Sequence, residues 1–526
     1  MIATGIITKD FKKFENLFLK LKNGLRFSRL GKPFTTTNNK YFFDTGTGKV
    51  FKLNDNVYSV LDCLYSTDKF EELFELDMSL DDLKSALTEI EEAVSTENIL
   101  QNPPVMDMLL NNGNKNEKDI TQTQMRHLTI EMTERCNLRC KYCIYHDDSC
   151  GFRTFGKKNI TFDTIKKAID MLSESTEEEV FISFYGGEPL LEFDLIKKTI
   201  EYCDNKMLHK KVGYNMTTNA TLITEEIANY LASLEEYFTT ISLDGPKLIH
   251  NKNRVFRDGT GSFDNTIEGI KNLVKAEGEK AKKRINFNVV LDDTSTETLE
   301  EIQDFFRTSE FIPEGSQITA SYIDIAPKDF KYLGVGTKED RQYNDFIRGK
   351  RDPLTAWSVD KLKSKTTTLN STPLISRDFI DKGLARIHKR MFIDKPAQVH
   401  YMNGCCVPGG RRLYLTVNGD FAVCERLGPS PFLGNVDEGI DFEKIKKYYI
   451  TDFVNEAKKY CNDCWAINTC SLCYTNCYDK EGLQIGHRHL QCLMYRQSIE
   501  DDLKLYHELL EREPESLAYL DEIHFS

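Results

Sequence analysis

Three cysteines at 136–143 have the residue types and spacing to hold a metal cluster. Cys136, Cys140 and Cys143 follow a predicted strand at 128–132, so their thiols belong to the loop that leaves that strand. Thiolates are the preferred ligands of iron–sulfur clusters, and three of them can hold three irons of a four-iron cube. No fourth cysteine lies nearby at ligand spacing, which leaves one iron open to a small molecule. The structural alternatives are a zinc loop or three buried thiols.

A second group of cysteines lies near the C-terminus. Nine of the 15 cysteines fall between Cys405 and Cys492. Scattered core cysteines would not gather in this way, and a single zinc ribbon needs only four ligands. The ligand candidates are Cys406, Cys424, Cys461, Cys464, Cys470, Cys473, Cys477 and Cys492.

Further candidate site residues follow predicted strands. Gly186 and Gly187 come directly after an apolar strand, and two glycines there let a ligand approach the backbone closely. Asn219 and Ser242 follow or end the next two strands, and Arg254 can pair with a carboxylate through two hydrogen bonds. The alternatives are a tight turn for the glycines and capping or turn formation for the polar residues.

The elements that must position these residues alternate between strand and helix. This alternation predicts parallel strands joined by crossover helices, and six strands predict an open or partial barrel. Sites in such folds lie at the carboxyl ends of the strands. The predicted strands are 128–132, 180–185, 212–217, 238–243, 285–291 and 318–325, and the predicted helices are 162–175, 193–206, 224–234, 263–276 and 296–306.

The N-terminal part has a different pattern. Two aromatic or β-branched runs at 40–52 flank an Asp-Thr-Gly-Thr-Gly turn, which predicts a hairpin. Helices are predicted at 56–65, 69–76 and 80–94, the last after a capping serine, Ser79. A hairpin with three helices predicts a winged-helix-like domain, and a helical cap on the barrel is the alternative.

These patterns divide the chain into six predicted parts. They are a winged-helix-like domain at 33–103, a linker at 104–125, the barrel at 126–325, a bridging region at 326–403, the cysteine-rich domain at 404–495 and a helical tail at 496–526.

The composition narrows the class of protein. The net charge of −13 argues against a nucleic-acid or membrane-surface partner. No apolar run is long enough for a transmembrane helix, and the first thirty residues lack a signal core, so we expect a cytoplasmic protein. Cysteines in that compartment favour metal chemistry over disulfides.

The cysteine spacing, with Tyr142 before the last thiol, resembles that of radical S-adenosylmethionine (SAM) enzymes. The resemblance implies a 4Fe-4S cluster whose open iron binds SAM, and reductive cleavage of SAM to a 5′-deoxyadenosyl radical. Gly186, Gly187 and Glu188 match a motif that holds the SAM amino group. Tyr142 is then expected near the adenine, and Asn219, Ser242 and Arg254 near the carboxylate or ribose.

The C-terminal cysteines resemble the SPASM domain, which carries one or two auxiliary 4Fe-4S clusters. This resemblance implies an outer cluster on Cys461, Cys464, Cys470 and Cys492, and an inner cluster on Cys406, Cys424 and a later cysteine. The chain departs from the pattern at Tyr474, where the family has a cysteine, so Cys473 or Cys477 takes that role and Cys405 is a further candidate. Glu425 occupies the place of a proposed general base in sulfatase-maturating relatives.

The N-terminal part resembles the leader-recognition domain of peptide-modifying radical SAM enzymes, in which a peptide adds as a strand to a sheet edge. We therefore expect an α/β radical SAM enzyme with a partial (βα)6 barrel that matures a ribosomally synthesised precursor peptide. The expected product is an intramolecular thioether or C–C crosslink, and the expected reductant is a flavodoxin or ferredoxin. The alternatives are a sulfatase-type maturase forming formylglycine and a non-catalytic iron–sulfur or zinc scaffold that binds peptide.

Overall fold

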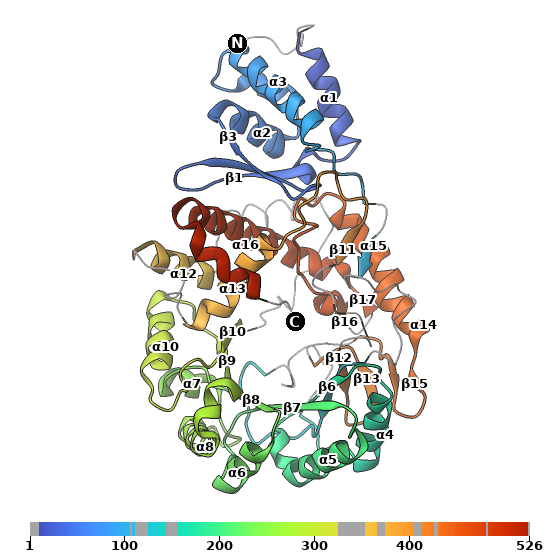
Figure 1. Cartoon of the computed structure of the whole chain (residues 1–526), viewed down its shortest axis with the longest axis vertical. Coiled ribbons are helices and arrows are strands. Elements are labelled where there is room, and N and C mark those ends of the chain that lie inside the picture. The colour runs from blue at the N-terminus through green and yellow to red at the C-terminus, as the bar shows by residue number, and fades with distance from the viewer. Residues whose placement is uncertain are drawn as a thin grey trace.

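The computed structural model has three parts (Figure 1): an N-terminal part at the top, an open ring of strands and helices at the bottom, and C-terminal elements between and beside them. It describes residues 10–105, 108–110, 125–143, 145, 155–323, 353–364, 374–402, 406, 408, 412–425, 430–479 and 482–523.

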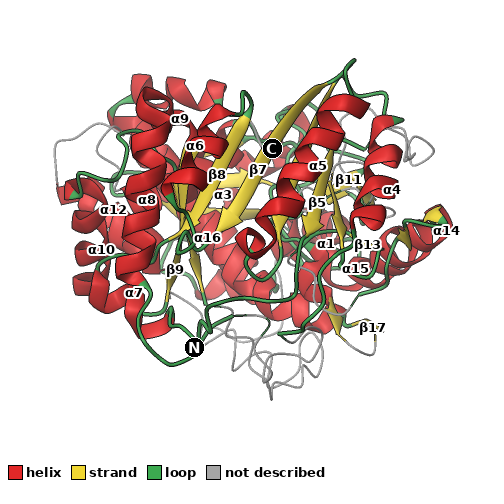
Figure 2. Ribbon diagram, turned by 90° about the horizontal axis from the view of Figure 1, so that it is seen from below, coloured by secondary structure: helices red, strands yellow, loops and turns green. Residues whose placement is uncertain are grey.

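The ring is a sheet of parallel strands that neighbour one another in chain order. Helices cover its outer face (Figure 2), as crossover connections require. The strands are β5 (His127–Glu131), β6 (Glu179–Tyr185), β7 (Lys211–Thr218), β8 (Tyr237–Ser242), β9 (Ile285–Leu291) and β10 (Ile318–Tyr322). The helices between them are α4 (Phe162–Ser173), α5 (Phe193–Lys206), α6 (Glu225–Ser233), α7 (Lys247–Asn253), α8 (Phe263–Glu277), α9 (Ala281–Arg284) and α10 (Thr296–Thr308).

Sequence periodicity and caps explain where these helices lie. Thr161, Thr224 and Ser295 each accept a backbone N–H three residues ahead, which fixes the starts of α4, α6 and α10. The apolar stripe of α4 is buried against the sheet. All five predicted crossover helices, and the first five predicted strands, agree with the structure to within two residues at each end.

The sheet continues beyond the predicted barrel. β12 (Arg412–Leu415) pairs in parallel with β5, placing Tyr414 opposite Thr129. β13 (Asp420–Ala422), β14 (Gly434–Asn435) and β15 (Gly439–Ile440) then extend it antiparallel, giving a ten-stranded sheet. β12 and β13 form a hairpin whose turn contains Asn418 and Gly419, and the first strand of this hairpin pairs with the edge of the barrel. The cysteine-rich segment shares one sheet and one apolar core with the barrel.

The N-terminal part is a three-stranded antiparallel sheet, ordered β1-β2-β3, with three helices. Its elements are α1 (Lys12–Lys22), β1 (Gly31–Thr35), β2 (Lys40–Asp44), β3 (Val50–Leu53), α2 (Asp55–Thr67) and α3 (Leu80–Thr96). Phe14 and Phe18 of α1 share the core of α2 and α3, so this part begins before residue 33, the predicted start. The predicted helix at 69–76 is a short 3₁₀ helix at Glu71–Glu75.

A long C-terminal helix, α16 (Ile485–Arg512), connects the N-terminal and cysteine-rich parts. It begins eleven residues before the predicted helical tail at 496–526, inside the cysteine-rich segment. Phe34 of β1 and Phe43 of β2 pack with Leu503 of α16 and Leu384 of α13 (Leu374–His388) in one apolar cluster. Figure 1 shows α13 and α16 between the N-terminal part and the ring.

The predicted linker and bridging region contain short elements of their own. β4 (Met108–Leu110) pairs in parallel with β11 (His400–Met402), and α12 (Pro353–Ser364) precedes α13. The cysteine-rich part adds α14 (Phe442–Lys444), a π-helical turn at Ile445–Asp452, α15 (Phe453–Cys461), β16 (Tyr478–Asp479) and β17 (Gly482–Leu483). Among the described helices, none combines the length and apolarity needed to cross a bilayer.

Candidate active site

The loop that carries Cys136, Cys140 and Cys143 leaves the carboxyl end of β5. Its first residues pair with the glycine motif after β6: the Gly187 N–H donates to the Thr133 carbonyl at 2.8 Å and the Glu188 N–H to the Arg135 carbonyl at 2.9 Å. The cysteine loop and the glycine motif are therefore held together by backbone hydrogen bonds.

The two glycines are required by this approach. Gly186 has φ +129°, and a Cβ on Gly187 would lie 2.0 Å from the Arg135 carbonyl oxygen. Only glycine fits at these positions. The sequence predicted that a ligand comes close to the backbone at these glycines. In the structure, the backbone of the cysteine loop comes close to them.

Glu188 links the glycine motif to the end of β7 through hydrogen bonds. Its carboxylate accepts hydrogen bonds from the Leu190 N–H at 3.1 Å, the Thr218 hydroxyl at 2.7 Å and the Asn219 N–H at 2.9 Å. The side chain is buried, and burial raises its pKa to about 7, against the effect of those three donors.

Asn219 reaches the cysteine loop from the end of β7. Its amide donates to the Asn137 side-chain oxygen at 2.9 Å, and the Asn137 amide donates to the Thr221 hydroxyl at 2.8 Å. Neither Asn137 nor Thr218 stood out in the sequence, because their role depends on two strand ends meeting at one edge of the sheet.

The segment after α7 holds the other side of the cysteine loop. The Arg139 N–H donates to the Val255 carbonyl at 2.7 Å, and the Lys141 N–H donates to the Asn253 carbonyl at 3.0 Å. The loop is therefore fixed between the glycine motif and the segment Asn253–Val255.

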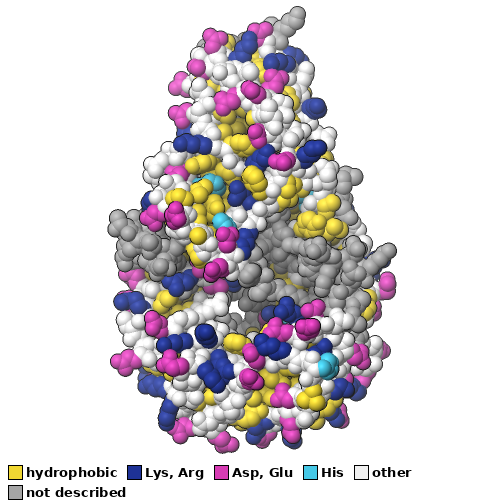
Figure 3. All heavy atoms as spheres, viewed as in Figure 1, with side chains coloured by type: hydrophobic (Ala, Val, Ile, Leu, Met, Phe, Trp, Pro, Cys, Tyr) yellow, Lys and Arg dark blue, Asp and Glu magenta, His cyan; other side chains and the backbone are white. Residues whose placement is uncertain are grey.

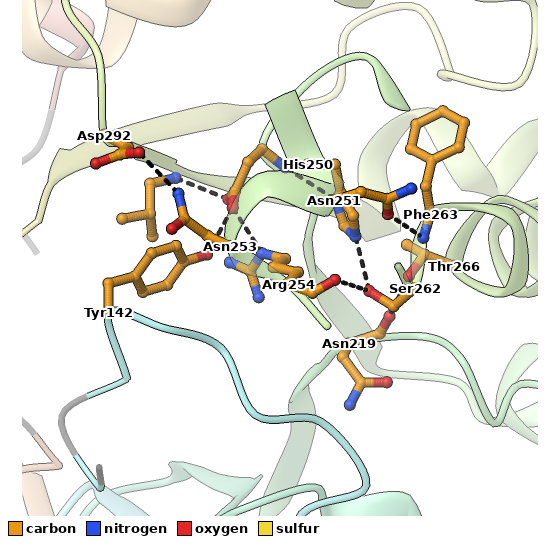
Figure 4. Close-up of polar contacts among 12 residues, drawn as sticks. Tyr142, Asn219, His250, Asn251, Asn253, Arg254, Ser262, Phe263, Thr266 and Asp292 are labelled. Carbon is orange, nitrogen blue, oxygen red and sulfur yellow. Dashed lines mark hydrogen bonds and ion pairs between the residues drawn. The ribbon is translucent and has the colours of Figure 1, made fainter. Parts of the chain in front are cut away.

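Asp244, at the end of β8, joins that segment to Tyr142 (Figure 4). Its carboxylate accepts from the Tyr142 hydroxyl at 2.6 Å, from Arg254 Nε at 2.9 Å and from the Val290 N–H at 3.0 Å. The guanidinium of Arg254 lies 5.4 Å from the centre of the Tyr142 ring. Asp244 was not among the predicted site residues, and only the fold shows that it binds both Tyr142 and Arg254.

Burial and charge set the protonation of this network. Burial lowers the pKa of Arg254, but Asp244, Tyr142 and Cys140 together outweigh burial and hold that pKa above its ordinary value. Burial raises the pKa of Tyr142 well above its usual range. His250 accepts from the Asp244 N–H at 3.4 Å and contacts the Ser262 hydroxyl at 3.0 Å, and burial lowers its pKa to about 4. His250 is therefore neutral, and it holds Asp244 and Ser262 in place through these contacts.

The three thiols fit an iron–sulfur cluster. Burial raises the pKa of Cys136 to about 12 and of Cys140 to about 11, and the charge of Cys143 adds to both. A bound cationic cluster would relieve this cost, because metal ligands bind as thiolates. The Leu138 N–H donates to Cys136 Sγ at 3.4 Å, a contact that tunes cluster sulfurs. Among the described residues, no three Cys, His, Asp or Glu side chains converge on a single ion.

Ser242 and Glu425 lie apart from this network. Ser242 is half-buried at the end of β8, in register with Asn288 of β9. The Glu425 carboxylate pairs with Arg412 of β12 at 3.3 Å. β12 runs parallel to β5 with Arg412 opposite His127, so Glu425 lies at the amino end of β5, away from the carboxyl end that bears the cysteine loop.

The predicted outer-cluster cysteines meet at one cavity. Cys461, Cys464 and Cys470, on the segment Cys461–Cys470 that we name the outer cysteine loop, line it together with Cys492 of α16. Its other walls are largely apolar: Met108, Tyr401, Tyr460, Ala466, Ile467, Tyr495, Arg496 and Ile499. The Leu472 N–H donates to Cys470 Sγ at 3.4 Å, as Leu138 does at Cys136. Four thiols around one apolar cavity are a donor set that fits a 4Fe-4S cluster.

The predicted inner ligands are less closely grouped. Cys424, Cys473 and Cys477 belong to or pack against the main core, and Cys477 is fully buried. Tyr474, the position where a cysteine was expected, is buried and donates its hydroxyl to the Cys406 carbonyl at 2.6 Å. The tyrosine therefore supports the backbone of a predicted ligand. Cys405 and Cys150 lie outside the described residues.

Comparison with known proteins agrees with this geometry. The model of the radical SAM superfamily matches residues 130–306. The chain is 30% identical over 233 residues to a cysteine-type anaerobic sulfatase-maturating enzyme of Clostridium novyi, covering 41% of this chain and 59% of that enzyme. It is 25% identical over 407 residues to the radical SAM cyclopropyl synthase TigE of Paramaledivibacter caminithermalis, covering 73% of this chain and 76% of that enzyme.

A solved structure shares the fold. Native anSMEcpe with bound AdoMet covers 76% of this chain and 100% of its own, with a TM-score of 0.52 and 19% identity. The chain spans 48% and 59% of the length of two of the curated relatives it matches, so their activities do not transfer directly. The three-cysteine loop, the parallel sheet and the match over residues 130–306 together show that this chain contains a radical SAM domain.

Proposed function

We propose that this chain is a radical SAM maturase that modifies a ribosomally synthesised precursor peptide. The observation that carries the proposal is the cysteine loop at the carboxyl end of β5, fixed by backbone hydrogen bonds to the glycine motif and to the segment Asn253–Val255. This arrangement keeps three thiols in place at the edge of the sheet where ligands bind.

Each residue around the loop has a defined part in this proposal. Cys136, Cys140 and Cys143 hold the cluster, which with SAM supplies a 5′-deoxyadenosyl radical that abstracts hydrogen from the peptide. The glycine motif and Ser242 offer polar groups to SAM. Arg254 is anchored by Asp244 through Nε, so its guanidinium is oriented before SAM binds.

A peptide substrate is supported by the relatives. One relative is named as a sulfatase-maturating enzyme, and TigE is named as a cyclopropyl synthase. The structure of anSMEcpe was also solved with AdoMet and the Kp18Cys peptide bound. In this chain, the winged-helix-like N-terminal part would bind the leader at β3, one of the two edge strands of its sheet.

The charge of the N-terminal part suggests the character of the leader. Residues 55–97 contain 13 acidic and two basic residues, and Figure 3 shows acidic side chains with Lys and Arg among them over the N-terminal part at the top. This segment forms α2 and α3, which follow β3. A leader carrying Lys and Arg would be attracted to it.

The C-terminal cysteines would hold one or two auxiliary 4Fe-4S clusters. They would take up the electron released when the substrate radical closes an intramolecular thioether or C–C crosslink. A cytoplasmic flavodoxin or ferredoxin would supply the electron for SAM cleavage.

Formylglycine formation is the second candidate function. The matches to sulfatase-maturating enzymes favour it. The general base of that reaction would have to be a group other than Glu425, because the strand register places Glu425 at the opposite end of the sheet from the cysteine loop.

One assay tests these functions. Anaerobically reconstituted protein is given dithionite, SAM and a short Cys-containing candidate peptide. We expect 5′-deoxyadenosine and a peptide that has lost two hydrogens, with neither product from the Cys140→Ala variant. Absence of 5′-deoxyadenosine contradicts the enzyme assignment, and a product that reacts with a hydrazide, as an aldehyde does, favours formylglycine over a crosslink.

A further inference from the structure

The hairpin turn between β2 and β3 contacts the outer cysteine loop, more than 400 residues away in the chain. The Thr45 hydroxyl donates to the Trp465 carbonyl at 2.8 Å, and the Asn468 amide donates to the Thr45 carbonyl at 2.8 Å. Thr45 is fully buried, so both hydrogen bonds are shielded from water. Phe43 adds an edge-to-face contact with the Trp465 ring, 6.1 Å between centroids.

Asp44 makes this turn rigid. Its buried carboxylate accepts from the Thr47 N–H at 2.8 Å and the Thr47 hydroxyl at 2.7 Å, and from the Leu100 N–H at 2.7 Å. We name residues 44–49 the Asp44–Lys49 turn. The conformation of this turn is therefore set by the Asp44 carboxylate, which binds Thr47 within the turn and the Leu100 N–H outside it.

The turn is also attached to the segment 390–397. The Ile393 N–H donates to the Thr47 carbonyl at 3.0 Å, and the Ala397 N–H donates to the Gly46 carbonyl at 3.0 Å. A Cβ on Gly48 would lie 1.7 Å from the Met391 carbonyl oxygen, so this contact needs glycine. The Asp-Thr-Gly-Thr-Gly sequence therefore specifies a docking element as well as a hairpin turn.

Two more contacts bind the N-terminal part to the outer cysteine loop. The Val105 N–H donates to the Asn462 side chain at 2.9 Å, and the Arg26 N–H donates to the Asp463 side chain at 3.4 Å. The loop lies between α15 and a 3₁₀ turn and has no helix or strand of its own. Such a loop keeps one conformation only when groups outside it satisfy its backbone.

We propose that the Asp44–Lys49 turn is part of the auxiliary cluster site, and that Thr45 is a positioning residue for Cys461, Cys464 and Cys470. The inference rests on the proposed auxiliary cluster. Thr45 and Asn468 hold the loop between Cys464 and Cys470, which keeps the thiols at the cavity shared with Cys492. The N-terminal part thus has a structural task besides leader binding.

The test measures auxiliary iron directly and needs no peptide. In a full-length parent with Cys136, Cys140 and Cys143 changed to Ala, the remaining iron belongs to the C-terminal sites. Thr45→Val keeps the side-chain shape and removes the hydroxyl. Asn468→Ala removes the second hydrogen bond of the turn, the one to the Thr45 carbonyl, together with the Asn468 contact to His400. Thr37→Val is the matched control, because Thr37 contacts Glu508 of α16 and not the loop.

We expect Thr45→Val and Asn468→Ala to lose iron to a chelator about 10-fold faster than the parent, with an altered EPR signal after reduction, and Thr37→Val to behave as the parent. If Thr45→Val is insoluble, the iron loss and EPR signal of Asn468→Ala alone test the proposal. Parent-like iron retention and EPR in Asn468→Ala overturn the inference. A parent without iron also overturns it, and leaves the 5′-deoxyadenosine assay of the unmodified chain as a separate test of the proposed function.

Discussion

At the scale of single residues, Asp244 shows how one buried carboxylate can organise a pocket. It binds a phenol, a guanidinium and a backbone N–H, and both Tyr142 and Arg254 therefore have fixed positions before any ligand arrives. Hydrogen bonds to a charged group contribute about 1.5–3 kcal/mol each. Loss of one of them changes the geometry of the cysteine loop as well as its stability.

Tyr142→Phe removes one of these bonds and should weaken SAM binding. We expect a higher KM for SAM with a smaller change in kcat, and a reduced SAM-induced change in the EPR spectrum of the cluster. Tyr202→Phe is the control, because Tyr202 makes a comparable bond to Asp170 at 2.7 Å between α5 and α4. Equal effects of the two substitutions would show that the Tyr142 hydroxyl serves stability alone.

His507 gives a prediction on acid stability. It is buried on α16 against Phe34 and Tyr41, and burial lowers its pKa from 6.5 to about 4. The unfolded chain therefore binds the proton first, and the contribution to stability is present above pH 6.5 and lost as pH falls to about 4. The full effect is on the order of 3 kcal/mol.

His507→Phe keeps the aromatic packing and removes this titration. The variant should lose less of its thermal stability than the unmodified chain between pH 6.5 and 4.5, as followed by Tm. Exposed His209→Phe should leave the pH profile unchanged. A His507→Phe profile that parallels the unmodified chain would contradict the prediction.

At the scale of elements, connecting turns do much of the positioning. The cysteine loop and the outer cysteine loop lack helix and strand, and each is fixed by backbone contacts to segments distant in sequence. The glycines at these contacts, Gly187 and Gly48, leave no space for a side chain. A larger residue at Gly187 or Gly48 would clash with a backbone carbonyl oxygen, and a backbone atom cannot move away as the end of a flexible side chain can.

Gly48→Ala and Gly24→Ala separate the two reasons for glycine. Both residues have a left-handed φ, +72° and +74°, but only Gly48 has neighbouring atoms within 4 Å of an added Cβ. Gly24→Ala should cost about 1–2 kcal/mol. Gly48→Ala should lower Tm further and release C-terminal iron, and similar melting curves for the two would refute a steric role.

At the scale of the whole molecule, the N-terminal part is integrated with the rest of the chain. Its sheet shares an apolar cluster with α13 and α16, and Lys32 forms an ion pair with Glu500 of α16 at 3.0 Å. The helix that makes these contacts also carries Cys492, so one element joins the N-terminal part and the cavity lined by Cys461, Cys464 and Cys470.

Removal of residues 1–103 should therefore damage the remainder. The truncation exposes Leu384 and Leu503, which are fully buried in the full chain, and removes the partners of the outer cysteine loop. We expect aggregation on gel filtration and a lower Tm than the full chain. A monodisperse truncated protein with unchanged C-terminal iron would show that the two parts are independent.

The sequence by itself determined the barrel elements, because apolar period and capping residues are local signals. It also determined which cysteines are candidate ligands. What only the tertiary structure decided is which distant groups meet: Asp244 with Tyr142, β12 with β5, and the Asp44–Lys49 turn with the outer cysteine loop. These meetings depend on strand order and on helix packing, which bring together residues that no local pattern connects.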